Sequence, residues 1–192
     1  MKIGIDFDGV ILDSQRNINF YADFWSTFEL KKSKLKDEDL EQECCFGWTK
    51  EEKKRFFDKH YDKISKNSEF IVGAKEILTI LKNEGHELYL VTARGQLGEE
   101  ETNLAKEKLD ELGVEFDMLC WSSVDKVSKC KELGINVMID DNPKNVEQFK
   151  DEENIKVLYF QDNFARSVDM KNVIKVDSWM DIYQEIFKLS KI

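Results

Sequence analysis

The sequence predicts an α/β protein built on a doubly wound parallel sheet, with helices on both faces and a small all-helical domain inserted after the first strand. Short apolar runs typical of buried strands alternate with longer amphipathic stretches typical of helices. The alternation begins at residue 2, is interrupted by roughly sixty residues of helical patterning, and resumes near residue 71. Strands that alternate with helices pair in parallel and are covered on both faces. We therefore expect a core domain of residues 1–13 and 71–192 and a helical domain of residues 14–70.

The composition is that of a soluble globular protein. Hydrophobic residues make up 41% of the 192 residues and charged residues 35%. No apolar run approaches the roughly 18 residues of a transmembrane helix, and acidic residues lie too near the start for a secretory signal, so no membrane partner is expected. The net charge of −10 argues against nucleic-acid polymers as partners. None of the four cysteines forms a C-x-x-C pair, which fits a reduced cytoplasmic location.

Residues 2–7 form the first expected strand, because they are mostly apolar and carry no helix start signal. Asp6 ends this strand, where a carboxylate is costly to bury unless it meets a metal or a hydrogen-bond network. Asp8 follows two residues later, and Gly9 supplies the backbone freedom for a bend that aims both carboxylates at one point. Two acids directed at one point imply a divalent cation, and their hard oxygen ligands favour Mg²⁺.

The inserted stretch shows helical patterns and no strand pattern. Residues 17–28 are rich in aromatics at helical spacing, which we assign mainly to the core of the insert, and residues 31–43 form a more charged stretch that we also expect to be helical. Thr49 and Glu52 have the spacing of a capping box and predict the start of a further helix.

The remaining elements alternate regularly. Helices are expected at residues 73–82, 96–112, 125–134, from 143 onward and 180–189, and strands at 87–91, 115–121, 136–139, 155–160 and 173–176. In a parallel sheet the site lies beyond the carboxyl ends of the strands. Three expected strands end in chemically distinctive segments, Asp6-Phe7-Asp8, Thr92-Ala93-Arg94 and Asp140-Asp141, and we expect the three to meet at one edge of the sheet.

These segments, taken in order, resemble the conserved motifs of the haloacid dehalogenase (HAD) superfamily of phosphohydrolases, which have a Rossmann-like fold. Asp6-Phe7-Asp8-Gly9-Val10 resembles motif I, and Asp140-Asp141 resembles the double-aspartate form of motif IV. The resemblance implies that Asp6 is the nucleophile and Asp8 the general acid and base. It also implies that Mg²⁺ is bound by the Asp6 carboxylate, the Asp8 backbone carbonyl and Asp140, with Asp141 acting through water or as an orienting group.

The resemblance also assigns the phosphate side of the site. Thr92 matches motif II, so its hydroxyl and the backbone amide of Ala93 are expected to bind phosphoryl oxygens. Motif III is a lysine near a helix start, and Lys126 fits best because it directly follows the expected N-cap Asp125. Two further lysines, Lys129 and Lys131, lie on the same expected helix and remain alternatives.

A small helical cap, the Val91-Thr92-Ala93-Arg94 form of motif II and the Ile139-Asp140-Asp141 form of motif IV are similar to the 5′(3′)-deoxyribonucleotidase group and its bacterial relatives. This likeness implies a Mg²⁺-dependent phosphomonoesterase that works through an aspartyl-phosphate and acts on a small phosphorylated substrate, a (deoxy)nucleoside monophosphate. The alternatives are a phosphatase for a sugar phosphate or other small metabolite and, in a different class, a non-catalytic phosphate-sensing or interaction protein.

Three residues outside the motifs are candidates for binding the substrate. Arg94 adjoins motif II and could touch a phosphate or pair with an acid. Phe46 and Trp48 flank Gly47 in an expected loop before the capping box, where an aromatic ring has less helix packing to do and could stack on a nucleobase.

Overall fold

A computed structural model describes residues 1–35, 45–96, 98–160 and 167–191. The chain divides into two compact units, Met1–Leu12 with Phe70–Ile192, and Asp13–Glu69. We refer to them as the sheet unit and the helical unit. No helix of the described residues is both long and apolar enough to cross a membrane.

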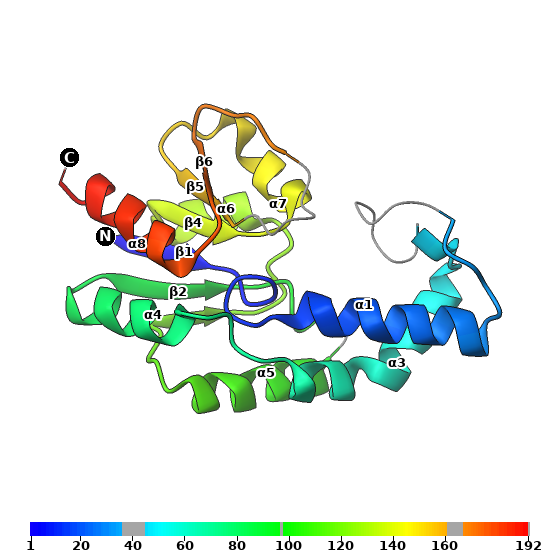
Figure 1. Cartoon of the computed structure of the whole chain (residues 1–192). Helices are drawn as coiled ribbons and strands as arrows, with labels where there is room; N and C mark the ends of the chain where they lie inside the picture. The colour runs from blue at the N-terminus through cyan, green and yellow to red at the C-terminus, as the bar shows by residue number, and fades with distance from the viewer. Residues whose placement is uncertain (36–44, 97, 161–166, 192) are drawn as a thin grey trace. The chain divides into compact units, whose positions relative to one another are not determined.

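The described residues of the sheet unit form one sheet of six strands, all paired in parallel, in the order β3-β2-β1-β4-β5-β6. Figure 1 labels every strand of this sheet except β3. The strands are β1 (Lys2–Ile5), β2 (Glu87–Val91), β3 (Met118–Cys120), β4 (Val137–Asp140), β5 (Lys156–Phe160) and β6 (Val173–Val176). The chain adds β2 and β3 on one side of β1 and then returns to add β4, β5 and β6 on the other. The order therefore reverses between β1 and β4, which is where open α/β sheets bind their ligands.

Helices cover both faces of this sheet, as the sequence predicts. They are α4 (Ala74–Asn83), α5 (Glu99–Leu112), α6 (Lys126–Leu133), α7 (Pro143–Glu147) followed by the 3₁₀ turn η2 (Gln148–Asp151), and α8 (Trp179–Leu189). Alternate strand residues face two separate apolar cores. One core joins Ile5 and Ile139 to helices α4, α5 and α8, and the other joins Met138 and Tyr159 to α6, α7 and η2. The doubly wound fold class is therefore confirmed.

The helical unit has a core of its own. Helix α1 (Ser14–Phe24) continues into the π-helical turn η1 (Trp25–Glu29), and α3 (Lys50–Asn67) packs against α1. The capping box predicted at the start of α3 is present, because Thr49 accepts a hydrogen bond from the Glu52 amide and the Glu52 carboxylate accepts one from the Thr49 amide. The buried residues of this core are Ala22, Trp25, Cys45, Phe46, Trp48, Phe56 and Ile64.

Three expectations need correction. Residues 31–35 are not helical, and Lys31 has a left-handed backbone with φ of 54°, while the rest of the expected helix at 31–43 lies outside the described residues. Strand β3 is only three residues long. The aromatic stretch of α1 and η1 buries Trp25 but leaves Phe20, Phe24 and Phe28 between 43% and 62% exposed, so only part of it serves as core.

Candidate active site

The site is built around two aspartates that follow neighbouring central strands. Asp6 comes directly after β1 and Asp140 ends β4, and the Asp6 amide donates to the Ile139 carbonyl at 3.0 Å. Asp6 is 7% exposed and Asp140 is fully buried. Parallel pairing of β1 with β4 thus brings the two carboxylates together at the point where the strand order reverses.

Lys126 joins these two carboxylates. It is the first residue of α6, its side chain is fully buried, and its Nζ lies 2.7 Å from Asp6 Oδ2 and 2.5 Å from Asp140 Oδ2. Burial acts to lower the pKa of Lys126, but the carboxylates of Asp140 and Asp6 outweigh it and raise that pKa well above its usual value. Lys126 is therefore a fixed positive charge inside the site.

Helix α6 begins where it does because Asp125 caps it, accepting a hydrogen bond from the Ser128 amide at 2.9 Å. This cap places Lys126 in the site. Lys129 and Lys131 instead pair on the surface, with Glu132 and Glu152 respectively.

The site holds more negative charge than Lys126 offsets. The carboxylates of Asp6, Asp140 and Asp141 each offer an oxygen, and these oxygens lie within 4.8 Å of one another. Burial raises the pKa of Asp6 from 3.8 to about 7, with Lys126 opposing and Asp140 and Asp8 adding to the rise. Burial, together with Asp140 and Asp6, likewise raises the pKa of Asp141. A cluster of buried carboxylate oxygens of this kind fits a hard divalent cation such as Mg²⁺.

The loop after β1 must pass close to Asp141. Gly9 has φ of 72°, and a Cβ atom added there would lie 1.9 Å from Asp141 Oδ2. Glycine is thus required both for the backbone conformation and for the space that the carboxylate occupies.

Asp140 is held by residues of the following turn and of helix α7 as well as by Lys126. Its Oδ1 accepts hydrogen bonds from the Asn142 amide at 2.9 Å and from Asn145 Nδ2 at 3.1 Å. These bonds fix the orientation of a fully buried carboxylate, as a metal ligand or ion-pair partner requires.

Thr92 directly follows β2, the strand next to β1, and so lies at the same edge of the sheet. Its side chain is buried, and its Oγ1 accepts a hydrogen bond from the Arg94 amide at 3.2 Å. Ala93, between them, is exposed. The turn therefore places the Thr92 hydroxyl at this edge of the sheet, while the amides of Arg94 and Gly95 donate to Thr92 Oγ1 and to Glu101 Oε2.

Arg94 pairs with an acid, the second of the two contacts that the sequence left open. Its Nε lies 2.7 Å from Asp8 Oδ2 and its Nη2 lies 2.6 Å from Asp8 Oδ1, so the guanidinium grips the carboxylate with two donors. The guanidinium also lies 4.7 Å from the centre of the Phe7 ring.

Phe46 and Trp48 do not lie free in a loop, and the expectation that their rings are spared packing is wrong. Phe46 is 3% and Trp48 9% exposed, and their rings stack 6.1 Å apart in the core of the helical unit. The Trp48 indole Nε1 donates to Ser26 Oγ at 2.9 Å. Both rings are thus part of the unit's packing.

Truncating Trp48 should therefore weaken the helical unit. We expect Trp48→Ala to cost about 3–5 kcal/mol of folding free energy, because it empties a large site in a packed core. Urea unfolding followed by tryptophan fluorescence and circular dichroism measures this cost. Phe20→Ala, on an exposed ring of α1, is the matched control and should change stability little. Equal stability of Trp48→Ala and the intact protein would contradict the packing described.

His60 is a buried histidine in the same core, stacked on the Tyr21 ring and in contact with the tilted ring of Phe56. Neither ring nitrogen has a hydrogen-bond partner among the described residues. Burial, aided by Lys59, lowers the pKa of His60. His60 therefore binds a proton more readily in the unfolded chain than in the folded protein. This difference lowers the free energy of unfolding as the pH drops below about 6.5. His60→Phe should reduce this fall in unfolding measurements from pH 7.5 to 5.5. Parallel stability curves for the two proteins would contradict the account.

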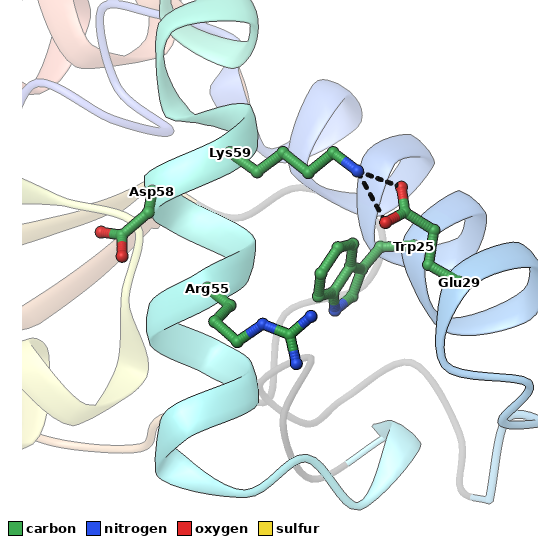
Figure 2. A pocket seen from close by; sticks show the side chains of 5 residues that line it. All are labelled: Trp25, Glu29, Arg55, Asp58 and Lys59. Atoms are coloured by element: carbon green, nitrogen blue, oxygen red, sulfur yellow. Dashed lines mark hydrogen bonds and ion pairs between the residues drawn. The ribbon is translucent and has the colours of Figure 1, made fainter.

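Sequence reasoning missed a hollow of about 270 Å³ in the helical unit, lined by Trp25, Glu29, Arg55, Asp58 and Lys59 (Figure 2). Lys59 pairs with Glu29 at 2.6 Å, and the Arg55 guanidinium lies 5.5 Å from the Trp25 ring centre. Within the described ranges, Arg55 makes no other ion pair or hydrogen bond. The signal in the sequence is the spacing of four between Arg55 and Lys59, which places both on one face of α3.

Known proteins resemble this chain in sequence and in fold. A Halalkalibacterium halodurans protein named Putative nucleotidase BH1399 is 24% identical over 182 residues, which span 94% of this chain and 89% of that protein. A haloacid dehalogenase-like hydrolase from Streptococcus pneumoniae superposes with a TM-score of 0.70 at 17% identity, covering 96% of this chain and 97% of that one. A predicted phosphatase from Clostridium acetobutylicum superposes with a TM-score of 0.69 at 17% identity, covering 97% and 98%.

The family match spans nearly the whole chain. Residues 1–191 match the family described as 5′ nucleotidase, deoxy (pyrimidine), cytosolic type C protein. The resemblance to the HAD superfamily is thereby confirmed, and with it the enzyme class. The chain belongs to this nucleotidase family and is a phosphatase of the HAD superfamily.

Proposed function

We propose that the chain is a Mg²⁺-dependent phosphomonoesterase that hydrolyses (deoxy)nucleoside monophosphates through an aspartyl-phosphate on Asp6. The observation that carries the proposal is the buried group of Asp6, Lys126 and Asp140 where the strand order reverses. The family match over residues 1–191 supports the nucleotide as substrate. We also propose a cytoplasmic location, in keeping with the family.

In the first half of the reaction, a carboxylate oxygen of Asp6 attacks the phosphorus of the substrate, and the bond from phosphorus to the ester oxygen breaks. Asp8 gives a proton to that oxygen as the nucleoside leaves. The Thr92 hydroxyl, the Ala93 amide and Lys126 stabilise the phosphoryl oxygens.

In the second half, a water molecule passes a proton to Asp8 as its oxygen bonds to phosphorus. The bond from Asp6 to phosphorus breaks, which returns Asp6 and releases inorganic phosphate. Lys126 remains beside Asp6 throughout, which lowers the repulsion between that carboxylate and the phosphate.

The residues present fit the metal that this reaction implies. The Asp6 and Asp140 carboxylates and the Asp8 backbone carbonyl would hold Mg²⁺, and Asp141 would act through water or orient the others. When bound, the ion supplies positive charge against the phosphoryl oxygens and the clustered acids.

Magnesium should therefore stabilise the folded protein. A ligand that binds only the folded state stabilises it by about 2.7 kcal/mol at a hundred times its dissociation constant. We expect Tm to rise between EDTA and millimolar Mg²⁺, measured by calorimetry, and the rise to be smaller in Asp140→Asn. An unchanged Tm would contradict a metal site in the free protein.

We propose that the helical unit, predicted as residues 14–70, serves as the cap that selects the substrate. The core motifs address only the phosphate, so discrimination between substrates must come from other residues. The polar hollow lined by Trp25, Glu29, Arg55 and Lys59 offers two cations, an anion and an aromatic ring, and it replaces Phe46 and Trp48 as the candidate for that role.

The substrate proposal is tested by comparing kcat/KM for deoxynucleoside monophosphates, sugar phosphates and p-nitrophenyl phosphate with Mg²⁺ and with EDTA. We expect the highest value for a nucleoside monophosphate, and loss of turnover in EDTA. Sugar phosphates that match or exceed nucleotides would establish the metabolite phosphatase instead. A folded protein that binds phosphate but turns over none of the three would contradict the proposed substrate.

A further inference from the structure

We propose that Arg94 is a positioning residue that holds Asp8 for proton transfer, and that it does not bind the substrate phosphate. This inference rests on the proposed function, because it concerns the step in which Asp8 exchanges protons. It adds a further functional residue to those of the four motifs at the sheet edge.

Arg94 and Asp8 form a bidentate ion pair, which we call the clamp. The guanidinium donates from Nε to one oxygen of Asp8 at 2.7 Å and from Nη2 to the other at 2.6 Å. Two parallel donors fix both the position and the plane of the carboxylate, which a single bond or a lysine cannot do. An aspartate side chain has two torsions, and paired donors to both of its oxygens restrict both torsions.

Arg94 and Asp8 differ in how far their side chains are exposed to solvent, and this difference indicates different roles. The Arg94 side chain is only 4% exposed, whereas the Asp8 side chain is 38% exposed. The carboxylate can thus meet a substrate or a water molecule, while the guanidinium is shielded from solvent. An arginine that bound the substrate phosphate would need donors directed at the open side of the site.

Two further contacts hold Arg94 itself in place. Its guanidinium lies 4.7 Å from the centre of the Phe7 ring, an attractive cation–π distance, and Phe7 lies between the two motif I aspartates. The Arg94 amide donates to Thr92 Oγ1 at 3.2 Å. The clamp is therefore anchored to both the first and the second motif, and it links Asp8 to the phosphate-binding turn.

Loss of the clamp should slow proton transfer without removing any group that touches the substrate. A displacement of about 1 Å in a reacting group can cost about 10²-fold in rate. We expect Arg94→Met to lower kcat about 10²-fold with little change in KM. Arg94→Lys keeps the positive charge but loses the two paired hydrogen bonds. Its kcat should therefore lie between that of Arg94→Met and that of the unaltered enzyme. Arg16→Met, at an exposed arginine of the helical unit, is the matched control and should behave as the unaltered enzyme.

A double-mutant cycle decides whether Arg94 acts through Asp8. The experiment measures kcat and KM for a nucleoside monophosphate with Mg²⁺ in the unaltered enzyme, Arg94→Met, Asp8→Asn and the double variant, with melting curves for each. We expect the double variant to be no slower than Asp8→Asn within about threefold, because a positioning residue has nothing left to position. A further loss of about 10²-fold in the double variant, or a raised KM with unchanged kcat in Arg94→Met, would overturn the inference in favour of a phosphate ligand.

The same cycle separates this inference from the function on which it rests. An unaltered enzyme that is inactive with Mg²⁺ would overturn the proposed function, and the inference would fall with it. An active enzyme with independent effects of Arg94 and Asp8 would overturn the inference alone. If the Tm of Arg94→Met is well below that of the unaltered enzyme, the cycle is repeated with Arg94→Lys. Coupled effects of Arg94→Lys and Asp8→Asn on kcat would then support the inference, and independent effects would overturn it.

Discussion

Asp6→Asn is expected to abolish turnover, with a loss on the order of 10⁴-fold or more in kcat, as found when a nucleophile is removed from a catalytic unit. The amide cannot attack phosphorus, and the neighbouring Asp140 is poorly placed to replace it, because that carboxylate is fully buried and held by Lys126 and Asn145. Steady-state assays with a nucleoside monophosphate and Mg²⁺ measure the loss.

The fold should survive this change. Asparagine has nearly the same size as aspartate, and Lys126 keeps its ion pair with Asp140 at 2.5 Å. Circular dichroism and a melting curve therefore provide the control, and mass spectrometry excludes deamidation back to aspartate. Substantial activity in a folded, intact Asp6→Asn protein would remove Asp6 as nucleophile.

Lys126→Met is expected to lower both the stability of the protein and its activity. It removes the buried cation between Asp6 and Asp140, and breaking a buried ion pair from one side costs about 3–5 kcal/mol. Urea unfolding in EDTA measures this cost. Mg²⁺ should restore part of the lost stability, because a divalent cation offsets the same carboxylates, but activity should not return.

Lys129→Met is the matched control, since Lys129 lies three residues further along the same helix and pairs with Glu132 on the surface. Its stability and activity should match those of the unaltered enzyme. If Lys129→Met lost far more activity than Lys126→Met, the assignment of the phosphate-side lysine would be wrong.

The fold and the centre of the site could be predicted because they depend on local patterns. Buried parallel strands appear as apolar runs, and the acids that end them, Asp6 and Asp140, must meet once β1 and β4 are neighbours. Lys126 was identifiable from its place after the N-cap Asp125, because a helix start fixes where its first side chain lies.

Contacts between distant parts of the chain could not be predicted in this way. Arg94 and Asp8 lie 86 residues apart in the sequence, and nothing local distinguishes an arginine that pairs with an acid from one that binds phosphate. Trp48 follows a glycine, which is typical of a loop, but its indole nitrogen bonds to Ser26 from another part of the helical unit. Local pattern predicts where a residue lies along an element, and packing decides what it touches.

The central claim is that Asp6 carries the phosphoryl group during turnover, and trapping that group tests it most directly. Asp8→Asn should slow hydrolysis of the aspartyl-phosphate, so the intermediate can be quenched with acid after mixing with a nucleoside monophosphate and Mg²⁺. Borohydride reduces an acyl phosphate to an alcohol, and peptide mass spectrometry locates the reduced residue. The account predicts reduction at residue 6, dependent on substrate and absent in EDTA. Turnover with no reduction at residue 6, or with reduction at another carboxylate, would contradict it.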